Sequence, residues 1–376
     1  MGDVFDSIFG QPKVREFFRA TISSGRVTHA YLFTGPAGSN KTAAAYAFAQ
    51  AIICKDHGCG ECDDCKRAQR RAHPDIRYYA PEGVHGYLVE QIRTIVADSM
   101  LAPIRARCKV YILDRVDLLG TQAANAFLKT LEEPPEGVVF ILLGRTHEAV
   151  LPTIVSRCQV VPFRHIPATQ AAGIVSQNTG TSPEFARIFI EACDGSITNA
   201  FDFARSNERK EFRRRVIEIL ESLEHADSRD VLEYAQELIE RSKAPLDNVR
   251  TKQEEELSDS EEFLARSAIK QIEARQKRAL SAASVRYLGQ LTAIIRSWLR
   301  DLMVISAQTP ELIVNVDCKD YLVQTASRIS TDSIIRVLRE TYRCDEAIAY
   351  NVSPETCLDV LLFEIRKVLH GSSSAH

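Results

Sequence analysis

One short segment of this sequence carries residue types suited to holding phosphate. Residues 35–42 read GPAGSNKT and end in Lys41 and Thr42. In a phosphate-binding loop, backbone N–H groups and the dipole of the following helix hold the phosphate oxygens, a lysine reaches the terminal phosphates and a hydroxyl binds magnesium. The sequence therefore predicts a nucleotide site in which Gly35 and Gly38 shape the loop, while Lys41 and Thr42 contact the phosphates and Mg²⁺.

An acid and a cation at the end of a predicted strand bear on the same site. The run KVYILD places Asp114 where a magnesium-binding acid would stand, although an acid here could also simply cap the strand. The next residue, Arg115, cannot accept a proton from an attacking water as a carboxylate would. Asn40 replaces the glycine usual before the lysine, where the backbone often adopts a conformation that asparagine tolerates better than most residues. Together these residues predict a residual site that binds ATP and Mg²⁺ weakly without hydrolysis.

Four cysteines fall within twelve residues. Cys54, Cys59, Cys62 and Cys65 follow the pattern C-x4-C-x2-C-x2-C, with two glycines supplying tight turns. Four soft thiolate ligands are typical of a tetrahedral zinc site, and because no position is left for water, we expect the Zn²⁺ to be structural. A redox role for Cys62 and Cys65 is the alternative, but it leaves the other two cysteines unexplained.

The other cysteines and the basic clusters suggest no further chemistry. Two basic clusters, at residues 66–71 and 209–215, are expected to be solvated faces, and the formal net charge of −3 gives no footprint for independent nucleic-acid binding. The six remaining cysteines are scattered through apolar or helical stretches, where a reduced thiol packs as a small hydrophobic group: Cys108, Cys158, Cys193, Cys318, Cys344 and Cys357.

Length and composition bound the class of protein. A chain of 376 residues exceeds what one hydrophobic core usually supports, so two or three domains are expected. With 45% hydrophobic and 26% charged residues, the composition is that of a globular protein. No apolar run reaches the roughly 18 to 20 residues of a membrane span, and the first residues lack the layout of a signal peptide. We therefore expect a cytoplasmic protein without membrane contact.

The first 165 residues alternate apolar runs with helical patterns. Short β-rich runs are found at 30–34, 76–79, 109–113, 138–143 and 160–163. Such alternation predicts an α/β domain in which a parallel sheet is covered by helices.

Helical periodicity takes over after residue 166. Apolar residues of the segment 288–302 repeat at helical spacing, and Ser353 and Pro354 predict the start of a final helix. Between them, residues 254–262 carry six acids and a basic run follows to Arg278, which favours a flexible or weakly packed linker. We expect the second half to be all-helical with a charged interruption.

Four strings, taken with their order and spacing, give the sequence a family resemblance. They are the altered phosphate loop followed by the cysteine cluster, His73-Pro74-Asp75, Leu131-Glu132-Glu133-Pro134-Pro135 and Ser156-Arg157-Cys158. In these features the chain resembles the subunits of bacterial DNA polymerase III clamp loaders, which are AAA+ proteins. The resemblance is specific over residues 5–205 and looser to 370. Within the family, the N-terminal run FDSIFGQ resembles delta-prime subunits more than gamma/tau subunits.

The resemblance implies a domain layout and two residue roles. The expected layout is an AAA+ domain at 1–165 with a zinc module at 54–65, a helical lid at 166–207, a helical segment and charged linker at 208–282, a C-terminal helical collar at 283–370 and a disordered tail at 371–376. Thr198 stands where active relatives carry an arginine that contacts nucleotide. Arg157 resembles the arginine that such subunits present to ATP on a neighbouring subunit, with a structural salt bridge as the alternative.

The same resemblance implies a stator without ATPase activity of its own. It implies a hetero-oligomer with gamma/tau and delta subunits, which acts through the complex on a sliding clamp and primed DNA. Two alternatives stay open. One is a gamma/tau-type ATPase with an unusual active site, and the other is a zinc-dependent adaptor that binds nucleic acid through the basic residues beside the cysteines.

Overall fold

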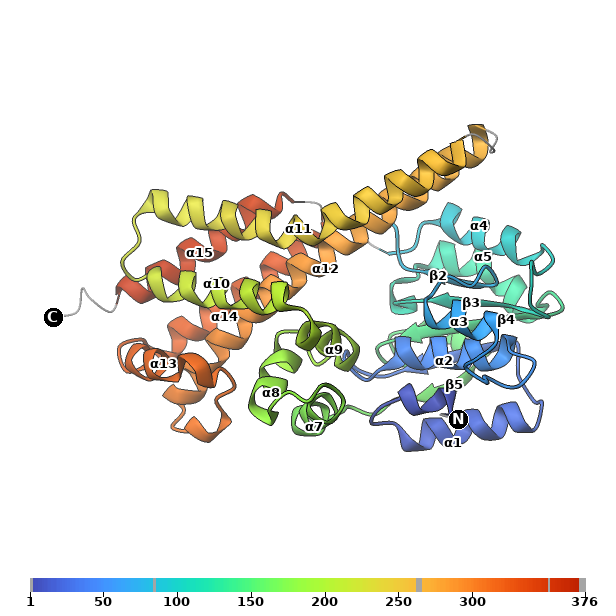
Figure 1. Ribbon diagram of the computed structural model, residues 1–376, viewed down its shortest axis with the longest axis horizontal. Coiled ribbons are helices and arrows are strands. Elements are labelled where there is room, and N and C mark those ends of the chain that lie inside the picture. The colour runs from blue at the N-terminus through green and yellow to red at the C-terminus, as the bar shows by residue number, and fades with distance from the viewer. Residues whose placement is uncertain (1–2, 84–85, 262–265, 351, 372–376) are drawn as a thin grey trace. The chain divides into compact units, whose positions relative to one another are not determined.

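The chain forms two compact units. A computed structural model describes residues 3–83, 86–261, 266–350 and 352–371 (Figure 1). The first unit comprises Met1–Val175 and Gly195–Thr198, and the second comprises Ser176–Asp194 and Asn199–His376. Among the described residues, no helix is both long enough and apolar enough to cross a membrane. The finer division at 165, 207 and 282 stays a prediction.

The first unit is built on a five-stranded parallel sheet. Its strands are β1 (Ala30–Thr34), β2 (Ile76–Tyr79), β3 (Lys109–Leu113), β4 (Val138–Gly144) and β5 (Gln159–Pro162). Their order across the sheet is β2-β3-β4-β1-β5, and every neighbouring pair is parallel. All five predicted strands are confirmed, with ends that differ by at most one residue.

Helices and short 3-10 turns precede, connect and follow these strands. They are η1 (Val4–Ser7), α1 (Pro12–Ser23), α2 (Lys41–Ile53), α3 (Asp63–Gln69), α4 (Val89–Ser99), η2 (Val116–Leu118), α5 (Thr121–Glu132), α6 (Pro152–Val155) and α7 (Ala168–Thr179). Because parallel strands need crossover connections, these helices cover both faces of the sheet.

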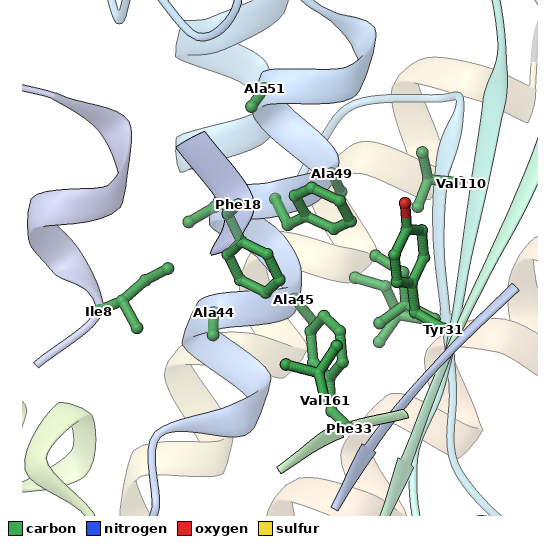
Figure 2. Packing of buried hydrophobic residues seen from close by; sticks show 14 of the residues in the cluster. Ile8, Phe18, Tyr31, Phe33, Ala44, Ala45, Ala49, Ala51, Val110 and Val161 are labelled. Atoms are coloured by element: carbon green, nitrogen blue, oxygen red, sulfur yellow. The ribbon is translucent and has the colours of Figure 1, made fainter. Parts of the chain in front are cut away.

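Alternate residues of β1 point to opposite faces of the sheet. Tyr31 and Phe33 belong to the core cluster that includes α1 and α2, and Leu32 belongs to the cluster that includes α4 and α5. Figure 2 shows Phe18 of α1 and Ala45 of α2 beside Tyr31 and Phe33. The small side chains of α2 let this helix lie close to the sheet, so its first turn stands just beyond the carboxyl end of β1.

The second unit is helical. It contains α8 (Pro183–Glu191), most of α9 (Ile197–Arg205), α10 (Asn207–Ser222), α11 (Ser228–Glu261), α12 (Arg266–Ser306), η3 (Pro310–Leu312), η4 (Val316–Cys318), α13 (Lys319–Ala326), α14 (Thr331–Ala349) and α15 (Pro354–Gly371). From residue 166 onward the described part of the chain has no strand, as predicted. The apolar residues expected between 288 and 302 are buried, with Trp298 fully so. The predicted start of the last helix at Pro354 is also confirmed.

The charged stretch predicted to be a linker has helical backbone where it is described. Residues 254–261 continue α11, and the basic run from Arg266 to Arg278 begins α12. Glutamate, lysine, arginine and glutamine are good helix formers, and long charged side chains need no core to form a solvated helix. The backbone on both sides of residues 262–265 is therefore helical, and the role of this stretch as a linker stays a prediction. Residues 262–265 lie outside the described residues. Of the disordered tail predicted at 371–376, Gly371 ends α15 and residues 372–376 lie outside the described residues.

One member of the second basic cluster is buried rather than solvated. Arg213 of α10 is 6% exposed and donates to Asp317 Oδ2 over 2.6 Å and to Asn315 Oδ1 over 2.7 Å. The carboxylate of Asp301 accepts hydrogen bonds from the backbone N–H groups of Val314 and Asn315 in turn. A buried arginine persists only when such partners compensate its lost hydration. The hydrogen bonds of Arg213 thus connect α10 to the segment before α13.

Candidate nucleotide site and cysteine cluster

The phosphate loop has left-handed backbone at Asn40, where a glycine is usual. It connects β1 to α2 at the carboxyl edge of the sheet, where ligands of open parallel sheets bind. Asn40 adopts the left-handed conformation, with φ 69° and ψ 20°, which confirms that this position needs a tolerant residue. Its side-chain amide donates to Ser7 O over 3.2 Å. Gly38 also has a positive φ of 73°.

The ammonium of Lys41 is bound by its own loop. It donates to the carbonyl oxygens of Gly35 and Pro36, the latter over 2.8 Å, and to Ser39 Oγ over 3.2 Å. Desolvation lowers the pKa of Lys41, although the carboxylates of Asp114 and Asp117 oppose the shift. Lys41 and Asp114 thus influence each other electrostatically, while their joint role in a nucleotide site stays a prediction. Thr42 follows directly in the first turn of α2.

Asp114 stands just beyond β3, two strands away from the loop. Because β4 lies between β1 and β3, the loop and the acid are separated by two strand spacings, about 10 Å. Its Oδ1 accepts from the N–H of Arg115 over 2.9 Å, and its Oδ2 accepts from the hydroxyl of Tyr78 over 2.6 Å. Tyr87 donates to the carbonyl oxygen of Asp114, also over 2.6 Å. The acid is held by a set of partners that the sequence gave no means to identify.

The residues after Asp114 do not supply a substitute base. Arg115 is exposed and left-handed, with φ 53°, and it caps the short turn η2. The carboxylate of Asp117 accepts from the N–H of Arg145 over 3.2 Å. A carboxylate that already accepts a hydrogen bond from a backbone N–H is poorly placed to take a proton from water.

The segment that carries Thr198 begins beside the loop. A Cβ built on Gly38 would lie 2.7 Å from the carbonyl oxygen of Gly195, so the two backbones are in direct contact. Thr198 lies in the first turn of α9, three residues after Gly195. The place predicted for a nucleotide-contacting arginine is therefore close to the loop in this unit, but its residue is uncharged.

Arg157 lies at the amino ends of the strands, whereas the phosphate loop lies at their carboxyl ends. It follows α6 and precedes β5, whose residue Gln159 pairs with Tyr31 near the start of β1. The loop begins where β1 ends, so the length of β1, about 16 Å, separates the two ends. Arg157 lines an open hollow of about 630 Å³ together with Thr28, His29, Ala30, Leu131, Glu132, Ser156, Cys158 and Gln159.

The guanidinium of Arg157 has acceptors within its own chain. Its Nε donates to Glu132 Oε1 over 2.9 Å, and its Nη2 contacts the same oxygen. Its Nη1 donates to Thr153 O over 2.8 Å and to Ser156 Oγ over 3.2 Å. The structure thus joins two of the predicted strings, because Glu132 belongs to the Leu131–Pro135 string and ends α5. The sequence gives the order of the two strings but does not indicate that Glu132 pairs with Arg157.

The four clustered cysteines converge as a metal site requires. Their sulfur atoms all lie within 4.8 Å of one another, and the Sγ atom of Cys54 is 3.7 Å from that of Cys59 and 3.8 Å from that of Cys62. Four thiolates bound to zinc at about 2.3 Å in a tetrahedron place their sulfurs about 3.8 Å apart. A disulfide would need about 2.05 Å. The cluster therefore fits a tetrathiolate metal ion, and Cys54 and Cys65 are buried.

The string His73-Pro74-Asp75 ties the cysteine cluster to the sheet. His73 is buried, and its Nε2 lies 3.3 Å from a carboxylate oxygen of Asp64, which precedes Cys65 in α3. Asp75 is fully buried and accepts from the backbone N–H groups of Ile104, Arg105 and Ala106 over 2.7, 2.8 and 2.9 Å. The string is structural: it fixes the loop before β3 beside the cluster.

Replacement of Asp75 by asparagine is expected to lower the free energy of unfolding by about 2 to 3 kcal/mol at pH 7, because an amide cannot accept all three hydrogen bonds. Burial acts to raise the pKa of Asp75, but the N–H donors outweigh it and lower the pKa. The contribution is thus present above about pH 3.9, the ordinary pKa, and is lost as the pH falls through the lowered value. Urea unfolding at pH 7 and pH 3 measures both effects. Equal losses at the two pH values would contradict the assignment.

Comparison with known proteins gives matches to part of the chain. Residues 10–167 match the family described as DNA polymerase III, delta subunit. The chain is 31% identical over 217 residues to DNA polymerase III subunit delta′ of Bacillus subtilis, which is 57% of this chain and 65% of that protein. It is 34% identical over 205 residues to subunit tau of the same organism, covering 52% and 36%. The matches thus span less than two thirds of these relatives.

A solved structure aligns with most of the chain at low similarity. It is a gamma subunit-related protein of DNA polymerase III from Thermotoga maritima, with a TM-score of 0.40 and 18% identity over 89% of this chain and 98% of that one.

Proposed function

We propose that this chain is a delta-prime-type stator of a DNA polymerase III clamp loader, in keeping with the match of residues 10–167 to the family described as DNA polymerase III, delta subunit, and with the similarity to subunit delta′ of Bacillus subtilis. In this role it is a fixed member of a hetero-oligomer. It presents Arg157 to ATP bound on a neighbouring gamma/tau subunit and does not turn over ATP itself.

The position of Arg157 is the observation that carries this proposal. Arg157 lies at the amino end of β5, and the phosphate loop of the same chain lies beyond the carboxyl end of β1, about 16 Å away along the sheet. An arginine side chain does not span that distance. A phosphate-stabilising role for Arg157 therefore requires the nucleotide of another subunit, and the hollow of about 630 Å³ beside it is open to solvent for such contact.

The local features of the nucleotide site support a non-hydrolytic role. Lys41 is bound by the loop carbonyls, Arg115 stands where a base is needed, and Thr198 brings no positive charge. Gly35 and Gly38 lie in the loop between β1 and α2, Thr42 lies in the first turn of α2, and Asp114 directly follows β3. We infer a site that holds ATP or ADP weakly and does not cleave it.

The partners follow from the same proposal. They are gamma/tau and delta subunits, and the complex acts on a sliding clamp and primed DNA in the cytoplasm. The second unit, whose described secondary-structure elements are all helices, is proposed to supply the collar that joins the subunits. Zn²⁺ held by Cys54, Cys59, Cys62 and Cys65 is proposed to be structural, because the four thiolates complete a tetrahedron.

Purified chain, alone and mixed with gamma/tau and delta subunits of its own organism, tests the proposal. We expect no ATP turnover by the chain alone above that of its Lys41→Ala variant, because a base is lacking. We expect a hetero-oligomer of defined mass in size-exclusion chromatography with light scattering. Failure to join the complex would overturn the stator role.

A gamma/tau-type ATPase is the second candidate, because the tau relative is as similar to this chain as the delta′ relative is. The same measurement separates the two. Turnover by the isolated chain that disappears in Lys41→Ala would establish the ATPase and exclude the stator.

A further inference from the structure

The carboxylate of Asp114 carries a hydrogen bond that the proposed function does not use. The hydroxyl of Tyr78, on β2, donates to Asp114 Oδ2 over 2.6 Å. The backbone N–H of Arg115 donates to Oδ1 over 2.9 Å. Both oxygens of the acid therefore already accept hydrogen bonds from their own chain, and one of these donors is a side chain that a mutation can remove.

Aromatic contacts hold the ring of Tyr78 in place. It stacks against Tyr46 of α2 with a centroid distance of 6.2 Å and an interplanar angle of 21°. The guanidinium of Arg71, just after α3, lies 4.8 Å from the centroid of the Tyr46 ring. Stacked rings and a cation over a ring face are both attractive arrangements. Tyr46 thus orients Tyr78, and Arg71 in turn holds Tyr46.

The hydrogen bond from Tyr78 to Asp114 joins a hydroxyl donor to a carboxylate oxygen. A neutral phenol beside a carboxylate forms a charge-assisted hydrogen bond, which is stronger than a bond between neutral groups. A hydrated Mg²⁺ ion would bind to the same carboxylate oxygens of Asp114, directly or through its water ligands.

We propose that Tyr78 is a positioning residue that weakens the coupling between nucleotide and Mg²⁺ at the residual site, because its hydroxyl occupies Oδ2 of Asp114. This inference rests on the proposed nucleotide site and adds one point to it. Nucleotide binds to the loop with little assistance from the metal, in contrast to a site whose acid is available to Mg²⁺. The relevant quantity is the ratio of nucleotide affinities with and without Mg²⁺.

Fluorescent N-methylanthraniloyl-ADP titrated into the full-length chain measures this ratio. One titration contains excess Mg²⁺. The other uses buffer that a resin has freed of divalent ions, so that no dissolved chelator strips the zinc. We expect the wild-type affinity to be nearly the same in both buffers. In Tyr78→Phe we expect the affinity with Mg²⁺ to exceed that without it by about tenfold, the size of one charge-assisted hydrogen bond.

Tyr79→Phe is the matched control. It makes the same chemical change one residue along β2, where the ring stacks with Tyr111 and belongs to the other face of the sheet. Its ratio should equal that of wild type. A Tyr78→Phe protein whose ratio is unchanged overturns the inference, and so does absence of binding by both proteins. A gain that is equal in both buffers also overturns it, because a general structural change would act without metal.

Lys41→Ala separates failure of the inference from failure of the site. If Lys41→Ala abolishes binding and Tyr78→Phe leaves the ratio unchanged, the nucleotide site stands and the role of Tyr78 falls. If binding persists in the Tyr78→Phe, Lys41→Ala double variant, the nucleotide lies elsewhere and the proposed site falls with the inference.

Discussion

Replacement of Arg157 by alanine is expected to slow ATP hydrolysis at the adjoining site of the assembled clamp loader by about 10³ to 10⁵ fold. A guanidinium beside the terminal phosphate stabilises the charge that spreads over its equatorial oxygens in the transition state. The stability of the chain should hardly change. The side chains of Arg157 and Glu132 are 31% and 48% exposed, and a surface ion pair of this kind is worth about 1 kcal/mol or less.

Single-turnover hydrolysis by the reconstituted complex measures this effect. Only the site that Arg157 completes is affected, so part of the fast phase should move to a phase slower by about three orders of magnitude or more. Arg157→Lys keeps the charge but loses the planar fork, and it should recover little of the rate. Assembly, followed by light scattering, should be unchanged in both variants. A fast phase of full amplitude in Arg157→Ala would remove the role in trans.

The contact with Glu132 offers a direct test of the structural alternative. If the ion pair only stabilises the fold, Glu132→Gln and Arg157→Ala should have the same small effect on the melting temperature and no effect on hydrolysis. If Arg157 serves a neighbouring nucleotide, Glu132→Gln should leave most of the hydrolysis rate, because Thr153 O and Ser156 Oγ still orient the guanidinium. The two hypotheses thus predict different hydrolysis rates for Arg157→Ala and similar small changes in stability. The hydrolysis rate of Arg157→Ala, with Glu132→Gln as its control, is therefore the decisive measurement.

The sheet could be predicted because its three central strands, β1, β3 and β4, are buried on both faces. Runs such as Val138–Gly144 are apolar without interruption, and this pattern is typical of a parallel sheet covered by helices. The left-handed position at Asn40 could also be anticipated, because asparagine tolerates that conformation. Local chemistry determines both features, and so a single sequence is enough to find them.

The partners of the site residues could not be predicted in this way. Tyr78 and Asp114 are 36 residues apart, Arg157 and Glu132 are 25 apart, and Arg213 and Asp317 are 104 apart. No local pattern reports which side chains tertiary packing brings together. The burial of Arg213 illustrates the point: its basic neighbours predicted a solvated face, but a distant loop supplied the acceptors that made burial possible.

Replacement of Cys65 by serine is expected to abolish zinc binding and to unfold the module around it. The four sulfurs lie within 4.8 Å of one another, so loss of one thiolate leaves an incomplete site. Structural zinc contributes apparent free energies of about 10 to 16 kcal/mol in small zinc-finger peptides. The segment from Cys54 to Gln69 has only a short helix of its own, α3, to keep it folded. Metal analysis should fall from one zinc per chain to about none, with loss of amide protection across this segment.

The effect of the other cysteines decides between a structural metal and a redox pair. A tetrathiolate site needs all four ligands equally, so Cys54→Ser should be as damaging as Cys65→Ser. A redox pair formed by Cys62 and Cys65 would instead tolerate the loss of Cys54, and the metal content would be negligible in wild type as well. Cys344→Ala serves as the matched control, because this buried cysteine lies in α14 of the second unit. Its zinc content should be that of wild type, since its burial among apolar side chains raises the pKa of the thiol to about 12 and keeps it protonated.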